Sequence, residues 1–104
     1  MRIRVSSPGQ SLSEGDLDRI HQDLEKIDRR LAGRDEVDAE IRVNRDGSSE
    51  MVGVVLEVDY GRNHLVATSR GGDVNWCVRD AREEILRQIN DRTRRGHSSF
   101  LKRR

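Results

Sequence analysis

The first third of the chain changes from a two-residue to a three-or-four-residue spacing of its apolar positions. Residues 2–6 alternate polar and apolar side chains, which predicts a half-buried strand. A later apolar stripe predicts a helix with one buried face. The stripe consists of Leu17, Ile20, Leu24, Ile27 and Leu31. Ser11 and Glu14 have the spacing of a capping box, so we expect the helix to begin there and to stop at Gly33.

Three further strands are predicted after this helix, because the apolar spacing returns to two. Residues 37–43 alternate apolar and charged side chains, and residues 51–58 form a run rich in β-branched residues. A turn sequence at Asp46-Gly47 separates these two runs. A second turn at residues 60–63 leads to a short strand over residues 65–68. Connections this short favour an antiparallel meander.

A second helix is predicted from Asp73, whose side chain can cap a helix N-terminus. Its apolar stripe consists of Val74, Val78, Ala81, Ile85 and Ile89. Arg92 falls on the same face one turn later, so we expect the helix to extend beyond the core at that point. Gly96 is the expected end of the helix.

The predicted element order is therefore β-α-β-β-β-α. Both helices must bury one stripe, and a four-stranded sheet with two helices packed on one face satisfies this requirement. We expect an α+β fold with a single domain over residues 1–95 and a flexible basic tail over residues 96–104.

Composition supports one small domain of 104 residues and adds an uneven distribution of charge. Residues 79–104 carry nine Arg or Lys and four Asp or Glu, whereas the rest carries eleven basic and fifteen acidic residues. The formal net charge of +1 therefore hides a basic end that could bind a polyanion such as RNA. No apolar run is long enough to span a membrane, and the N-terminus lacks a secretory signal. Its one cysteine agrees with a cytoplasmic location.

Two segments give the chain a resemblance to a known family. Gly71-Gly72-Asp73 followed by Ile85-Leu86-Arg87-Gln88-Ile89 is similar to a glycine turn, an aspartate and a helix with the pattern Leu-x-Arg-Gln-Leu. Residues 24–29 are similar to a Leu-x-Lys-Leu-Glu-Arg pattern in the first helix. Together with the element order, these segments resemble the ribosome hibernation promoting factors, also called ribosome-associated inhibitors or sigma-54 modulation proteins. The resemblance covers nearly the whole chain.

The resemblance implies a short, non-enzymatic translation inhibitor of the stress response. Such a protein occupies the channel for messenger and transfer RNA on the small ribosomal subunit and contacts its rRNA. It implies no cofactor, no membrane and no small-molecule substrate, and a monomer rather than a dimer. Because the chain ends shortly after the second helix, we do not expect the dimerisation domain of the long members. The sequence departs from the family where Lys or Arg is common, at Glu84, Asn90, Asp91 and Thr93.

The candidate RNA-binding residues lie on both helices. The first helix contributes Lys26, Arg29 and Arg30, and the last contributes Arg79, Arg82, Arg87, Arg92, Arg94 and Arg95. Rows of cations on a helix can follow phosphates. The alternative is a solvated face balanced by the acidic residues of the last helix, and Asp23 lies among the cations of the first.

Other chemistry finds little support in the sequence. Trp76 and Tyr60 could stack on a base, although packing is the better interpretation for Trp76. Cys77 is expected to be buried, and the three histidines have no ligands at metal-binding spacing. No catalytic motif is present. A general double-stranded RNA-binding module and a protein-interaction domain that has kept the fold but lost ribosome binding remain alternatives.

Overall fold

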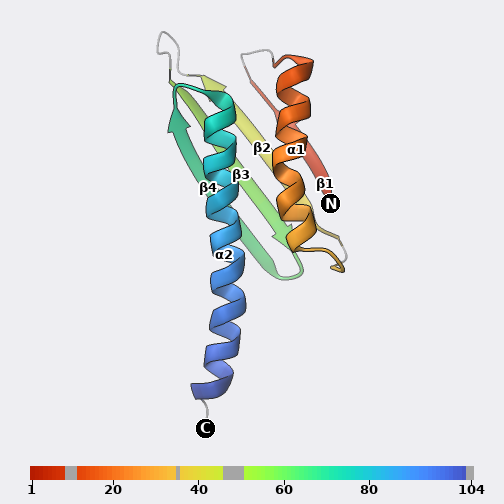
Figure 1. Cartoon of the computed structure of the whole chain (residues 1–104), viewed down its shortest axis with the longest axis vertical. Helices are drawn as coiled ribbons and strands as arrows, with labels where there is room; N and C mark the ends of the chain where they lie inside the picture. Colours follow the sequence, from red (N-terminus) through yellow and green to blue (C-terminus); the bar gives the residue numbers. More distant parts are fainter. Residues whose placement is uncertain (9–11, 35, 46–50, 103–104) are drawn as a thin grey trace.

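The computed structural model of the chain describes residues 1–8, 12–34, 36–45 and 51–102, with side chains through Thr93. Its elements follow the predicted order (Figure 1). They are β1 (Arg2–Ser6), α1 (Glu14–Arg30), β2 (Asp38–Arg45), β3 (Val52–Tyr60), β4 (Asn63–Gly71) and α2 (Val74–Lys102). The predicted α+β fold is therefore confirmed. The expected turn at residues 46 and 47 lies outside the described residues.

The four strands form one sheet in the order β1-β2-β3-β4. β2, β3 and β4 are antiparallel neighbours, as the short connections predict. β1 pairs with β2 in parallel. A parallel pair needs a long crossover, and α1 supplies it. Both helices lie on the same face of the sheet (Figure 1), and no helix or strand of the described residues covers the opposite face.

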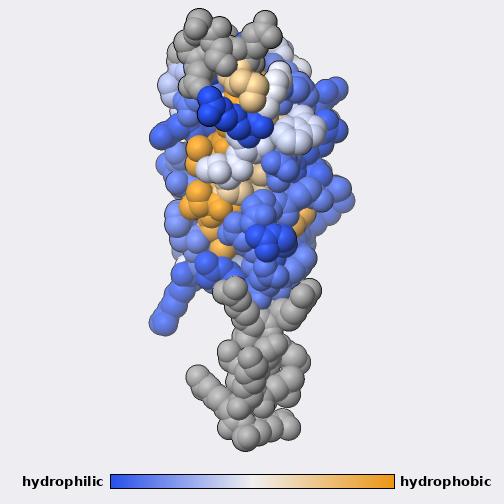
Figure 2. Space-filling view, turned by 90° about the vertical axis from the view of Figure 1, so that its left-hand side faces the viewer, coloured by the Kyte–Doolittle hydropathy of each residue, from blue (hydrophilic) through white to orange (hydrophobic). Residues whose placement is uncertain are grey.

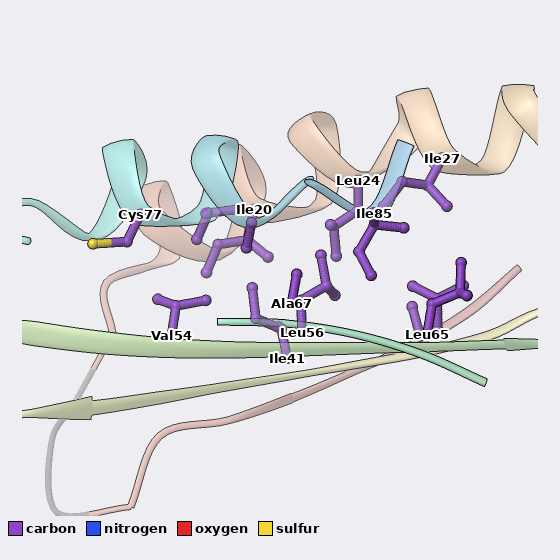
Figure 3. Packing of buried hydrophobic residues seen from close by; sticks show 14 of the residues in the cluster. Ile20, Leu24, Ile27, Ile41, Val54, Leu56, Leu65, Ala67, Cys77 and Ile85 are labelled. Carbon is purple, nitrogen blue, oxygen red and sulfur yellow. The ribbon is translucent and has the colours of Figure 1, made fainter. Parts of the chain in front are cut away.

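The core lies between this helical layer and the sheet (Figure 3). Leu24 of α1 and Ile85 of α2 point towards Ile41 and Leu56 of the central strands, and all four side chains are fully buried. Ile89 is the last buried residue of α2 among those whose side chains are described. Both predicted apolar stripes thus become core, although Leu17 and Val74 at their N-terminal ends are only partly buried. Hydrophobic burial of this kind is the main stabilising contribution to the fold.

The start of α1 differs from the prediction. Ser13 is the N-cap, since its Oγ accepts a hydrogen bond from the backbone N–H of Asp16 at 3.0 Å. In return, the Asp16 carboxylate accepts from the N–H of Ser13 at 3.4 Å. The expected Ser11–Glu14 box is therefore wrong, because a cap at residue 13 is what leaves Leu12 packed against the core. Ser11 itself lies outside the described residues.

The end of α2 also differs from the prediction. The helix does not stop at Gly96 but continues to Lys102 and extends well beyond the sheet (Figure 1). A glycine inside a helix costs only about 1 kcal/mol relative to alanine, which a long helix tolerates. The expected overhang at Arg92 is confirmed: its side chain is exposed and donates a hydrogen bond from Nη1 to Oδ1 of Asn63 at 3.1 Å. The flexibility of the tail remains a prediction.

Candidate nucleic-acid interface

The two helices run side by side in the same direction on the sheet (Figure 1), and two polar contacts join them. Arg82 donates from Nη1 to the backbone oxygen and the Oδ1 atom of Asp23, at 3.5 and 3.4 Å. About two turns further along both helices, Arg30 donates from Nε to Oδ1 of Asn90 at 3.1 Å. These contacts fix which faces of the helices meet. We call the surface along this line the helix seam; it is formed by Arg19, Asp23, Lys26 and Arg30 of α1 and by Arg79, Arg82 and Asn90 of α2.

Helix geometry places Arg19 and Arg79 at the same end of the seam. Residues three or four apart on a helix share a face. Arg19 lies four residues before Asp23, and Arg79 lies three residues before Arg82. Because Asp23 and Arg82 are in contact, the two arginines lie on the adjoining faces one turn earlier. Both are exposed.

The exposed cations of the seam have no carboxylate partner among the residues that the structure describes, and its one acidic side chain, Asp23, pairs with Arg82. Arg19, Lys26 and Arg79 are exposed and form no ion pair with any residue that the structure describes. Arg30 is exposed as well and is held by the neutral amide of Asn90. Four cations that are available to an incoming anion therefore lie along one line across two helices. Spaced cations of this kind suit a polyanion better than a small ligand.

Arg82, one of the predicted RNA-binding residues, does not present its charge at the surface. Its side chain is only 8% exposed, and its Nε donates to Glu83 at 3.0 Å while Nη1 reaches Asp23. A buried guanidinium needs such partners, because an unpaired charge away from water is costly. Arg82 therefore joins the two helices beneath the seam instead of contributing a free charge to its surface.

The outward face of α2 is closer to the solvated, charge-balanced alternative. The guanidinium of Arg87 donates to Glu84 at 3.0 Å and to Asp91 at 2.9 Å. The hydrogen bond from Arg87 lowers the pKa of Glu84, and the same interaction raises the pKa of Arg87. Glu84 also accepts from Gln88, whose amide bridges to the backbone of Val66 in β4. The positive charge of Arg87 is thus largely balanced on this face.

The same side of the molecule is mostly hydrophilic, with a smaller apolar area (Figure 2). A shallow groove runs there between α2 and β4 and is lined mainly by charged and amide side chains. Its lining residues are Asn63, Glu84, Arg87, Gln88, Asp91 and Arg92. Because acidic and basic groups alternate along it, this groove is a poorer candidate for a polyanion than the seam.

The remaining predicted site residues occupy several positions. Lys26 and Arg30 lie on the seam, as described above. Arg29 lies on the far side of α1 and pairs with Glu25 at 3.3 Å, an exposed pair of small energetic value. Arg92 contacts Asn63 at the overhang. The side chains of Arg94 and Arg95 lie outside the described part of the chain.

The pairing of the two helices cannot be seen in the sequence. Arg82 and Asp23 are 59 residues apart, so no local spacing in the sequence could reveal their contact. Arg19 precedes Asp23 by four residues and Lys26 by seven, so the sequence alone places it on the same flank of the helix as Lys26. Its importance depends on the position of the neighbouring helix.

Two aromatic residues were candidates for stacking, and they differ in exposure. Tyr60 is 3% exposed, and the Arg34 guanidinium lies 5.2 Å from its ring centre. Its ring is therefore part of the core and is not open to a base. Trp76 is 51% exposed at the start of α2, where packing had been the favoured interpretation. Cys77 is buried as predicted, and burial raises the pKa of its thiol.

Two other kinds of site find no support. Over the described residues, no three His, Cys, Asp or Glu side chains are grouped closely enough to hold a metal ion. Within that same part of the chain, neither helix is long and apolar enough to cross a bilayer.

Comparison with known proteins gives a match in structure. No family model and no curated protein sequence matches the chain. The N-terminal domain of Protein Y from Thermus thermophilus has a TM-score of 0.74 at 17% identity, over 86% of this chain and 96% of that one. A ribosomal subunit interface protein from Coxiella burnetii has a TM-score of 0.77 at 17% identity, over 89% of this chain and 98% of that one. The chain therefore has the fold of these proteins, and the resemblance drawn from its sequence is confirmed as a likeness of fold.

Proposed function

We propose that this protein is a non-catalytic, ribosome-binding translation inhibitor that contacts the rRNA of the small subunit through the helix seam. One observation carries the proposal: four exposed cations without carboxylate partners in the described chain lie along two adjacent helices. The fold shared with a ribosomal subunit interface protein supports the choice of RNA. Arg82 is left out of the proposed surface, and Arg87 is given a minor role.

The proposed mechanism is inhibition by occupancy. A protein bound in the messenger and transfer RNA channel blocks translation without any bond being made or broken. Each cation that neutralises a phosphate releases counterions, so affinity should fall steeply as salt is raised. The protein would act as a monomer in the cytoplasm and keep ribosomes inactive.

The test is co-sedimentation with purified small ribosomal subunits at low and high salt. The seam variant carries R19Q, K26Q and R79Q, and its matched control carries R2Q, R4Q and R42Q. The control removes the same charge from the uncovered face of the sheet, where these arginines pair with Asp38 and Glu40. We expect the seam variant to bind much more weakly and to lose roughly one unit of salt slope per phosphate contact.

The outcomes separate the proposal from its alternatives. Equal weakening by both triple variants would show that net charge matters and that the seam does not. Comparable affinity for any plain RNA duplex would favour the general duplex-binding module. No association at low salt would contradict RNA binding altogether and leave a protein-interaction domain. A single pair of variants on α2 gives a finer comparison: R79Q should reduce binding more than R87Q, because Arg87 is already paired.

A further inference from the structure

Trp76 is an unusual surface residue in this molecule. It is 51% exposed, and the other large hydrophobic residues that the described chain exposes, Met51 and Val66, lie in the sheet or beside it. Among the described residues of the two helices, Trp76 is therefore the one large apolar side chain that is exposed. Tryptophan is enriched at binding interfaces, because its ring gives a large apolar contact area.

The position of the ring is fixed by the neighbouring backbone. A Cβ atom added to Gly71 would lie only 3.2 Å from Cε3 and 3.3 Å from Cζ3 of Trp76, so the six-membered ring packs closely on this glycine. The backbone N–H of Trp76 donates a hydrogen bond to the carboxylate of Asp73 at 3.1 Å. The backbone and one edge of the indole are therefore held, while half of the side chain remains open to solvent.

Trp76 also lies about one helical turn before a residue of the helix seam. Arg79 follows Trp76 by three residues on α2, which makes the two side chains neighbours on the helix surface. Arg79 is one of the seam cations that has no carboxylate partner among the described residues. An exposed, positioned ring next to a free cation is the arrangement that single-stranded nucleic acid binding uses, with the base on the ring and the phosphate on the cation.

We infer that Trp76 is a stacking platform for an unpaired base of the RNA that the seam binds. The inference rests on the proposed RNA-binding function and adds to it a preference for unpaired bases. A line of cations alone would bind duplex and single strand alike, whereas stacking needs a base that is free of its neighbours. The end of the seam at Trp76 should therefore prefer a single-stranded or bulged segment.

Intrinsic fluorescence provides a direct test, because Trp76 is the one tryptophan of the chain. The probes are a mixed-sequence single-stranded RNA, the same strand annealed to its complement, and inorganic polyphosphate, which carries charge without bases. Binding is followed separately by the anisotropy of a labelled strand, with unlabelled probes as competitors. We expect the single strand to quench Trp76 emission strongly, and polyphosphate to compete for binding without quenching.

Variants make the test independent of fluorescence. W76A should weaken single-strand binding about tenfold, and W76F, which retains an aromatic ring, should keep most of it. V66A removes another exposed apolar side chain, from β4, and should have no effect. Circular dichroism and the urea midpoint check that each variant is folded.

The outcomes distinguish failure of the inference from failure of the function. If the labelled strand binds but W76A binds equally well, or if duplex and single strand quench alike, the stacking platform is wrong and the RNA-binding seam stands. If the labelled strand does not bind the wild-type protein at low salt, the stacking platform is wrong. If small ribosomal subunits also fail to co-sediment with the protein at low salt, the proposed function fails as well, and the exposed ring is left to a protein partner.

Discussion

Arg82 shows how one buried charge can join two helices. It is 8% exposed and lies between Asp23 and Glu83, while the second carboxylate oxygen of Asp23 is buried and has no hydrogen-bond partner among the described residues. Removing the guanidinium would leave the Asp23 carboxylate with no cation in a mostly buried position. We expect R82M to lower the free energy of unfolding by about 2–4 kcal/mol, measured by urea denaturation.

The matching variant at Asp23 shows whether this loss comes from the pair. D23N removes the carboxylate charge that R82M would leave without a cation. The double variant should therefore lose less unfolding free energy than the sum of the losses in the two single variants. Additive effects would mean that the two side chains do not interact appreciably. An R82M protein as stable as wild type would contradict the interhelical role altogether.

Most elements of the fold could be predicted because their signals are local. The alternation in residues 2–6 gives β1 with the bounds that the structure has, and the apolar stripes of both helices supply most of the core. The ends of the helices were predicted less well. Ser11 and Ser13 are both followed by an acidic residue at the capping-box spacing, so the sequence offers two starts. Packing of Leu12 on the core, a tertiary contact, distinguishes them.

The contribution of the N-cap to the stability of α1 can be tested by a single substitution. S13A removes the Oγ acceptor for the N–H of Asp16 and should cost about 1 kcal/mol of unfolding free energy. S13D keeps an oxygen at the cap and should retain nearly all of the stability. Thermal denaturation of the two variants gives the comparison. Equal stability of S13A and wild type would show that α1 does not depend on this cap.

The candidate site could be predicted only in part, because charge becomes available or neutralised through packing. The sequence placed cations on both helices but could not tell Arg79, which is exposed and unpaired within the described chain, from Arg87, which is paired. Arg82, a predicted RNA-binding residue, is buried beneath the seam. The position of the Trp76 ring likewise depends on a tertiary contact, its close packing on Gly71. Which charges are free to meet a polyanion is thus a property of the assembled molecule.

The end of α2 that extends beyond the core is expected to contribute to binding but not to stability. The described core ends at Ile89, and the helix continues beyond the sheet towards a basic terminus (Figure 1). Deleting residues 97–104 should therefore leave the urea midpoint nearly unchanged. It removes Lys102, Arg103 and Arg104, so we expect weaker binding to small subunits and a salt slope lower by up to about three units.

A full-length variant with these three residues changed to glutamine is the matched control, because it removes the charge and keeps the length. If deletion and neutralisation weaken binding equally, the contribution of the terminus is electrostatic. A loss seen only on deletion would mean that the length of the chain is required and that its charge is not. Unchanged affinity and salt slope in both variants would confine the RNA-binding surface to the seam and the residues beside it, because three cations that contact phosphates cannot be removed without lowering the salt dependence.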